Sequence, residues 1–497
     1  AIRSALGCGR WRLARWLWVE SLLLALAGGV LGILLARLGL VGMLQAMPDW
    51  MPRTDEIVVD GRVALAGLAL ALVTGLVFGA APATAQARAR IYSLLRQGSG
   101  TVGGRARGRS ALVVAEVALA FVLVIAAGLA ARSFWRAAQV DPGFEAQGVY
   151  TFSPMITDSK YEAAESRQAF FRQLRERLLA APGVETVGAI HMLPIRTQGF
   201  NGHLEVAGRE AAPGELPIVN WRVVSAGYFE TLNIPEITGR LLDERDRAGA
   251  LPTVLINQTF AEQHFPGQDP LGQRIRIDLE ASDEWLTVVG VVGDIRQHGL
   301  TTRVLPEIYR PVEQVERQVG LSFLVRSSLG PSEMSRTVDA ALAEIDPQVP
   351  AAFGETMASV LRQSLSFQRL ILILAAVFAG LAMVLGAAGI YGVVAFDVSR
   401  RTPEIGLRMA LGAHRGGVLR MILQQGLLPV AGGLVLGMGL SLALGRFVRS
   451  LLYEVEPGDP LTYAAMSLML GLVAVGAVLV PAWRASRVDP LVALRHE

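Results

Sequence analysis

The sequence predicts a polytopic α-helical membrane protein with six spans and one large extracytoplasmic α+β domain. Three observations lead to this prediction. Of the 497 residues, 52% are hydrophobic, and long uncharged segments recur along the chain. Arginine gathers in some of the connections between these segments, and acidic residues gather in others. Between the third and fourth segments lies a long stretch with the alternating patterns of strands and helices.

Six apolar segments are long enough to cross a bilayer as helices, which takes about 20 residues each. They are Trp16–Ala36, Val63–Ala85, Ser110–Ala131, Leu370–Phe396, Met421–Gly445 and Leu461–Trp483. The connections 1–15, 86–109, 397–420 and 484–497 carry excess arginine, which places them in the cytoplasm, whereas the short connections 41–60 and 450–460 are acidic. The sides then alternate consistently, so residues 133–367 are expected outside the cytoplasm.

The basic segment, Asp397–Arg420, contains five arginines between two uncharged spans. Thr402, Pro403 and Glu404 have the pattern of an N-cap, a first helical position and a first-turn carboxylate. Ile405, Met409 and either Leu411 or Gly412 follow at helical spacing, and Arg408 points to another face. This pattern predicts a short amphipathic helix on the membrane surface. The alternative is a basic loop that only sets the topology.

One module of the chain is duplicated. Residues 2–40 align without gaps to 407–445, and later identities include Pro82-Ala83 with Pro481-Ala482. The first copy lacks its front end, so we expect the sequence to begin partway through a longer protein. Glycines four residues apart recur in both copies and predict close helix packing. These glycines are Gly28, Gly32, Gly75, Gly79, Gly433 and Gly437.

Two further features of the membrane segments favour structural roles. Glu116 lies inside the third span, and snorkelling or helix pairing explains it better than a proton or substrate role. The stretch Gly98–Gly104 contains a formal GxGxxG, but no strand precedes it and arginines follow it. It is therefore interpreted as a linker between the two copies.

The external stretch shows two β-α-β units around a strand-rich insert. The first unit is Val149–Ile156, Tyr161–Leu179 and Val184–His191, and the second is Leu321–Arg326, Ser332–Ile345 and Val349–Gly354. Strand candidates of the insert are Ile218–Val224, Thr253–Asn257, Gln273–Ile277 and Trp285–Val292. We therefore expect a split β-α-β pair interrupted by a smaller, mostly β subdomain.

Composition argues against several functional classes. Lys160 is the only lysine and does not stand in Gly-Lys-Ser/Thr, so these residues contain no P-loop. Cys8 is the only cysteine, and the six histidines show no zinc-binding spacing. The net charge of +3 gives no basic field for nucleic acid. Carboxylates near turns, Asp243, Glu244, Asp246 and Asp294, form no recognisable catalytic set, so we expect no enzyme activity, cofactor or metal.

Several motifs resemble one known family. RTPEIGLRMALGA, at 401–413, closely resembles the coupling segment of MacB/FtsX-type ABC transporter permeases, although that family usually has a charged residue where Pro403 stands. SAGYFETLNIPEITGRLL, VLINQTFAEQHFPGQDPLGQRI and VVGVVGDIRQHGL look like the periplasmic region of the duplicated MacB-type permeases, also called acidobacterial duplicated orphan permeases. The ending PAWRASRVDPLVALRHE is similar to that family's ending, and the chain looks like its C-terminal portion.

The resemblance implies a domain division. Residues 1–97 would be the end of a first FtsX-like module, 98–109 a linker, and 110–132 the helix that opens a second module. Residues 133–367 would be a MacB-like periplasmic core domain, and 368–497 a second FtsX-like permease domain with its coupling helix at 399–415. The protein would lie in the cytoplasmic (inner) membrane.

The resemblance also implies a function. This chain would be the membrane subunit of a MacB-like ABC transporter, and a separate cytoplasmic ATPase dimer would bind the ATP. Its motion would reach the external domain by mechanotransmission and drive export, with a periplasmic adaptor and outer-membrane channel as further partners beside the lipid bilayer. Alternatives are an FtsX-like regulator of a cell-wall hydrolase, a lipoprotein-releasing permease, and a membrane sensor without an ATPase. The ATPase-coupling residues would be Arg401, Thr402, Pro403, Glu404, Ile405, Arg408, Leu411 and Gly412, with Arg3, Leu6 and Gly7 in the first copy.

Overall fold

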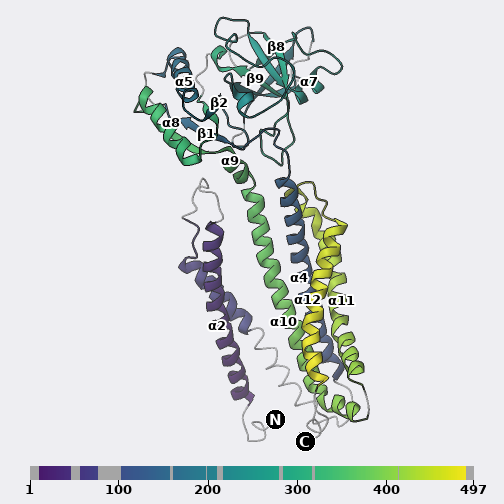
Figure 1. The fold of residues 1–497 in the computed structure, drawn as a ribbon. Helices are drawn as coiled ribbons and strands as arrows, with labels where there is room; N and C mark the ends of the chain where they lie inside the picture. The colour runs from purple at the N-terminus through teal and green to yellow at the C-terminus, as the bar shows by residue number, and fades with distance from the viewer. Residues whose placement is uncertain are drawn as a thin grey trace. The chain divides into compact units, whose positions relative to one another are not determined.

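The computed structural model describes residues 10–45, 56–76, 102–156, 161–196, 199–209, 216–278, 284–315, 320–411 and 414–487. The chain divides into two compact units, which are coloured by sequence in Figure 1. The membrane unit comprises Ala1–Arg132 and Gln368–Glu497, and the external domain comprises Ser133–Phe367. In the chain, the external domain is therefore inserted between two helices of the membrane unit.

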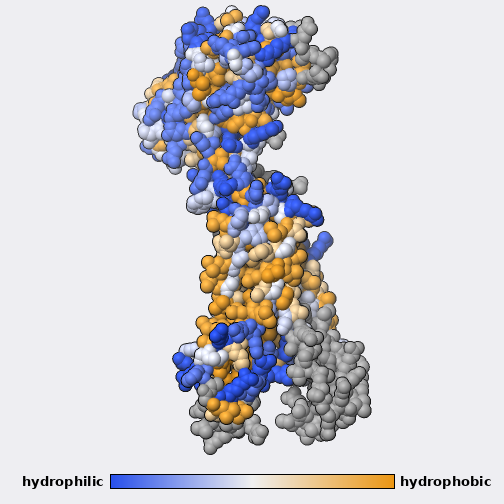
Figure 2. All heavy atoms as spheres, turned by 90° about the vertical axis from the view of Figure 1, so that its right-hand side faces the viewer, coloured by the Kyte–Doolittle hydropathy of each residue, from blue (hydrophilic) through white to orange (hydrophobic). Residues whose placement is uncertain are grey.

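Five helices among the described residues are long and apolar enough to cross a membrane. They are α2 (Arg10–Gln45), α4 (Val102–Ala138), α10 (Ser366–Ala410), α11 (Arg415–Val448) and α12 (Pro460–Ala485). The predicted span Val63–Ala85 coincides in part with a shorter apolar helix, Gly61–Leu76, and its remaining residues lie outside the described part. Figure 2 shows hydrophobic side chains over the middle of the helices and hydrophilic ones towards their ends.

Helices α4, α10, α11 and α12 share one buried core. Phe121 of α4 is fully buried, and its ring lies 6.4 Å from the ring of Tyr463 on α12. Asp459 caps the N-terminus of α12 by accepting a hydrogen bond of 2.8 Å from the Thr462 amide. The same carboxylate forms an ion pair with Arg132 of α4. Charged groups thus hold the helix ends together while apolar groups fill the middle.

The helical half of the external domain contains four strands in the order β11-β1-β10-β2 and is covered by α5 (Ala164–Leu179) and α8 (Pro331–Ile345). Its strands are β1 (Val149–Pro154), β2 (Val184–Ile190), β10 (Ser322–Ser327) and β11 (Ala351–Thr356). Because β10 pairs antiparallel with both β1 and β2, each β-α-β unit encloses a strand of the other. The short helix α9 (Met357–Ser364) then leads to α10.

The β-rich half continues the same sheet through a single residue pair, Ile190 with Val224. It contains two short helices, α6 (Tyr228–Thr231) and α7 (Gln258–His264), and a 3-10 turn, η3 (Val312–Gln314). Its strands are β3 (Phe200–Val206), β4 (Ile218–Val224), β5 (Glu236–Gly239), β6 (Thr253–Asn257), β7 (Arg274–Asp278), β8 (Leu286–Val292) and β9 (Glu307–Pro311). Strands β3, β5 and β9 are additional to the predicted ones.

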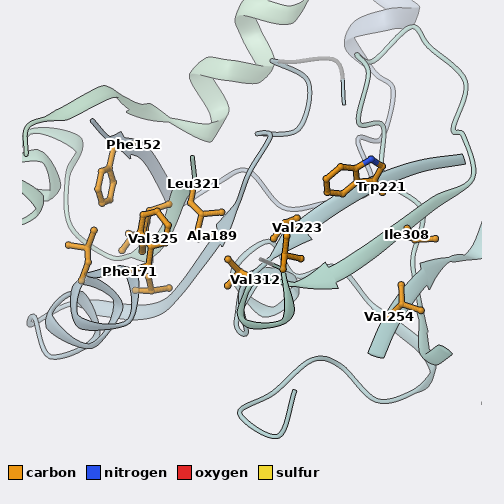
Figure 3. Close-up of a cluster of buried hydrophobic side chains, with 14 of the residues drawn as sticks. Phe152, Phe171, Ala189, Trp221, Val223, Val254, Ile308, Val312, Leu321 and Val325 are labelled. Atoms are coloured by element: carbon orange, nitrogen blue, oxygen red, sulfur yellow. The ribbon is translucent and has the colours of Figure 1, made fainter. Parts of the chain in front are cut away.

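A large apolar core runs through both halves of the external domain (Figure 3). It includes Phe171 and Val325 of the helical half and Trp221 and Ile308 of the β-rich half. Beside it, the fully buried Arg222 lies 2.8 Å from Glu307, and the Tyr309 hydroxyl donates a 2.9 Å hydrogen bond to the same carboxylate. Removing one partner of such a buried ion pair leaves the other charge uncompensated and destabilises the fold by about 3–5 kcal/mol.

Candidate functional site

The basic segment does not form a separate surface helix. Helix α10 runs without interruption from Ser366 to Ala410 and so includes residues 397–410. The Thr402 hydroxyl donates a hydrogen bond of 3.1 Å to the Val398 carbonyl, four residues earlier. A threonine inside a helix makes this bond, whereas an N-cap side chain accepts a bond from an amide two or three residues later. The prediction that Thr402 begins a new helix is therefore wrong.

The reason lies in an apolar stripe that continues through the segment. Ile390, Val394, Val398, Ile405 and Met409 recur at helical spacing and belong to the core of the membrane unit or pack against it. Burying this stripe favours one long helix over a break at Thr402. Ile405 is only 3% exposed, so its predicted role in contacting a partner is also wrong.

Three of the predicted residues are exposed at the end of α10: Glu404 and Arg408 on the helix, and Leu411 directly after it. Glu404 and Arg408 form an exposed ion pair of 2.6 Å, four residues apart. Leu411 is 80% exposed and Leu407 is 51% exposed, although sequence reasoning missed Leu407. We call these four residues the coupling surface.

The remaining predicted coupling residues have other placements. Arg401 donates 2.6 Å from Nη1 to Oε1 of Gln425, so it joins α10 to α11. Pro403 lies within α10. Gly412, Arg3, Leu6 and Gly7 lie outside the described residues.

Helix α10 is tied to α4 near the start of the basic segment. Asp397 lies 3.6 Å from Arg109, whose guanidinium carbon also stands 4.5 Å from the centre of the Phe396 ring. Farther along, the Glu116 carboxylate rests over Gly389, where a Cβ would collide with it. This contact agrees with helix pairing, the structural role favoured for Glu116.

A small cavity of about 70 Å³ separates α4, α10 and α11 at this level. Its apolar lining includes Val113, Ile390 and Val394, and its polar lining includes Asp397 and Gln425. Pro429 of α11, which also lines the cavity, cannot donate a hydrogen bond to the Gln425 carbonyl. The packing of α10 is therefore less complete here than in the core.

The predicted packing glycines fall into three groups. Gly433 and Gly437 lie against α4, where an added Cβ would come within 2.6 Å of Val117 and 2.8 Å of Phe121. Gly75 meets Ala25 of α2, and Gly79 lies outside the described residues. Nothing described lies within 4 Å of a Cβ on Gly28 or Gly32; Gly29 instead faces the helix Gly61–Leu76, so the prediction is corrected for these two positions.

The described residues contain no group of three or more His, Cys, Asp or Glu side chains that could hold a metal ion. The site is thus an exposed surface at one end of a long helix, joined to the buried core through Ile405 and to its neighbours through Asp397 and Arg401.

Two family models match the chain. One describes a MacB-like periplasmic core domain and matches residues 110–347, and the other describes an FtsX-like permease C-terminal and matches residues 376–490. Together they cover most of α4, the external domain up to residue 347, α10 from residue 376, and α11 and α12.

Curated relatives match over 55% of this chain. The "Probable syringafactin export ATP-binding/permease protein SyfD" of Pseudomonas syringae pv. tomato is 27% identical, with 42% of its length covered. The "Macrolide export ATP-binding/permease protein MacB" is 28% identical in Azoarcus sp., with 42% covered, and 29% identical in Neisseria gonorrhoeae, with 43% covered. The chain thus spans about two fifths of the length of these relatives.

Solved structures give weaker similarities. The periplasmic region of MacB from Actinobacillus actinomycetemcomitans has a TM-score of 0.31 at 14% identity, over 44% of this chain and 93% of that one. The extracellular domain of the ABC-type transporter YknZ from Gram-positive bacteria has a TM-score of 0.29 at 15% identity, over 42% and 100%.

Proposed function

Because this chain is a permease of the MacB/FtsX type of ABC transporter, we propose that it couples ATP hydrolysis by a cytoplasmic ATPase dimer to movement of its external domain. The coupling surface on α10 would receive the ATPase, and α10 would carry the displacement across the membrane. The work done outside would be export of a substrate.

The continuity of α10 is the observation that carries this proposal. Its 45 residues correspond to about 68 Å at 1.5 Å per residue, roughly twice the thickness of the hydrocarbon core. The helix begins at Ser366, directly after α9 of the external domain, and it includes the coupling surface near its other end. Since no loop intervenes between Ser366 and Ala410, a displacement at Leu407 would be passed along the helix rather than absorbed.

The chemistry of the coupling surface suits a protein partner. Leu407 and Leu411 expose apolar area beyond the span, and the Glu404–Arg408 pair lies beside them. A mixed apolar and charged surface is typical of a protein interface. The 497 residues contain no Gly-Lys-Ser/Thr, so ATP would be bound by another chain or by another part of the protein.

Export is favoured over hydrolase regulation or lipoprotein release by the relatives, whose names describe macrolide and syringafactin export proteins. We place the protein in the cytoplasmic membrane with the external domain on the far side, and the arginine-rich ends of the spans support this orientation. An adaptor and an outer-membrane channel would then be the partners that receive the substrate.

The proposal is tested by altering the coupling surface alone. Leu411→Asp places a charge on a side chain that is 80% exposed, so folding should be unaffected. The double variant Glu404→Arg with Arg408→Glu reverses both charges while keeping an oppositely charged pair four residues apart. We expect both variants to lose the permease-dependent stimulation of the ATPase in nanodiscs, by tenfold or more, with unchanged thermal unfolding.

Ser399→Asp is the matched control, because it adds the same charge to an exposed position of α10 outside the coupling surface. It should keep full stimulation. Full stimulation in Leu411→Asp and in the charge-reversed pair would contradict the proposal.

A further inference from the structure

The external domain contains a cavity of about 330 Å³ where its two halves meet. Helix α5 of the helical half forms one wall, and the loop Asp243–Arg247 with η3 of the β-rich half forms the other. Figure 3 shows three of the residues that line it, Leu321, Ala189 and Val312, between the group that contains Phe171 and the group that contains Trp221 and Ile308. Small-molecule sites are commonly of this size and often lie between subdomains.

The floor of the cavity is apolar. Phe171, Leu321 and Phe323 line it, and the ring centres of the two phenylalanines are 5.8 Å apart. Each of these side chains is at most 7% exposed, so they form a fixed surface backed by the core. An apolar group resting on this floor would be removed from water at little cost in protein reorganisation.

The α5 wall is mainly positive. Arg172 and Arg175 line it, with Gln168 one turn earlier and the exposed Glu176 at its edge. Nε of Arg175 donates to the Val187 carbonyl at 3.4 Å. Among the described residues, neither arginine has an ion-pair partner within 4 Å. Their guanidinium groups are therefore available to bind an anion.

The opposite wall is mainly negative, but most of its charge is already neutralised. Asp246 is bound 2.7 Å from Arg240, and Asp243 is bound 2.6 Å from Arg245, while neither of these arginines lines the cavity. Glu244 and Arg247 are exposed.

Two carboxylates on this wall, Glu244 and Glu313, have no ion-pair partner among the described residues. Glu244 is exposed, whereas Glu313 is half-buried. Burial raises the pKa of Glu313, and a hydrogen bond from its own backbone amide, with the fields of Arg175 and Arg172, only partly opposes that effect. A desolvated carboxylate of this kind would gain from a cationic partner.

We propose that this cavity binds a small amphipathic zwitterion with the chemistry of a short apolar peptide. Its carboxylate would lie against Arg172 and Arg175, its ammonium group against Glu313, and its apolar side chain on the floor formed by Phe171, Leu321 and Phe323. With the unpaired Arg172 and Arg175 on one wall and the partly buried, unpaired Glu313 on the other, the cavity favours a molecule with both charges over a simple anion or cation. A bound peptide would bridge the two halves, which share only one residue pair between β2 and β4.

The test uses the dipeptide Leu-Leu with the purified full chain in nanodiscs and measures binding by calorimetry. N-acetylation removes the ammonium charge, and C-amidation removes the carboxylate. Each change should weaken binding about tenfold or more, since each removes a charge-assisted interaction. In Glu313→Gln the acetylated and free peptides should bind equally, and in Arg175→Gln the amidated and free peptides should bind equally.

Arg177→Gln is the matched control, because Arg177 is also on α5 but pairs with Glu344 and does not line the cavity. It should leave the dissociation constant unchanged. Absence of Leu-Leu binding, or equal binding of the free and blocked peptides by the unmodified protein, would overturn the proposal. The peptide comparison needs no variant, so it remains decisive if a variant fails to fold. It also needs no ATPase, so its outcome is separate from that of the coupling experiment.

Discussion

Helices α2 and α11 align residue for residue, yet they have different neighbours. Each pairs with the helix that follows it: Gly75 packs against Ala25 of α2, and Gly426 of α11 packs against Val478 of α12. On α11, Gly433 and Gly437 also pack against α4. On α2, no described atom lies within 4 Å of a Cβ added to the equivalent Gly28 or Gly32. Glycine spacing therefore shows where another helix could approach closely, but it does not show whether a helix is present there.

The largest expected effect comes from filling the glycine positions. Gly437→Leu would bring a Cβ within 2.8 Å of Phe121 and 2.9 Å of the Ala118 carbonyl, so α4 and α11 would have to separate. Overpacking of this kind costs about 1–3 kcal/mol at each site. We expect a lower unfolding temperature in nanodiscs for Gly433→Leu and Gly437→Leu. The equivalent Gly28→Leu and Gly32→Leu should have little effect, and equal destabilisation in both copies would contradict the difference.

Each copy contains one pair of consecutive helices, α2 with Gly61–Leu76 and α11 with α12, and we expect both pairs to be destabilised alike by a larger side chain at the contact. Gly75→Leu would place a Cβ 2.5 Å from Ala25, and Gly426→Leu would place one 2.8 Å from Val478. We expect each variant to weaken its own helix pair by about 1–3 kcal/mol. Protease cleavage between the two helices of each pair, within residues 46–60 and within residues 449–459, would report the loosening of that pair. Sensitivity of only one copy would show that the pairs are not equivalent.

Much of this architecture could be predicted from the sequence because it depends on local patterns. The uncharged spans, the strands of the two β-α-β units and helices such as Pro331–Ile345 follow from hydrophobic periodicity. Strand β9 could not be found in this way. It is only five residues long and contains Glu307 and Arg310, and its burial depends on Arg222 in β4, far away in the chain.

The candidate site shows the same limit. The Thr402-Pro403-Glu404 pattern is a genuine local start signal, but burial of the stripe through Ile405 overrides it. A sequence signal for this existed, because Ile390, Val394, Val398, Ile405 and Met409 keep one helical period only if the helix is continuous. The charge and exposure of Glu404 and Arg408 could be predicted, whereas the inward direction of Ile405 required the position of α11.

The smallest effect concerns two equivalent aspartates. Asp60 and Asp459 each cap a helix at 2.8 Å, but only Asp459 also binds Arg132 of α4. Loss of a cap costs about 1 kcal/mol. We expect Asp459→Ala to destabilise the protein more than Asp60→Ala, with thermal unfolding as the measurement. Equal effects would mean that the ion pair with Arg132 contributes nothing.

This difference should depend on pH. Desolvation raises the pKa of Asp459, but hydrogen bonds from Thr462 and the charge of Arg132 outweigh it, and the pKa falls below its ordinary value of 3.8. The ionised form is thus favoured by folding. Its stabilisation is present above pH 3.8 and is lost as the pH falls below that value. The cost of Asp459→Ala should therefore shrink under acid conditions.

The central claim is that α10 transmits motion because it is one stiff helix, and a pair of matched double variants tests it most directly. Ser399 and Arg400 are both exposed on α10, just before the coupling surface. Glycine at both positions softens the helix by about 1 kcal/mol per residue relative to alanine, while both variants remove the same side chains. The measurement is the ATP-dependent change in hydrogen exchange of residues 133–367, in nanodiscs with the ATPase. We predict that the change persists with two alanines and is lost or strongly reduced with two glycines, at equal ATPase binding. An identical change in both variants would contradict transmission through α10.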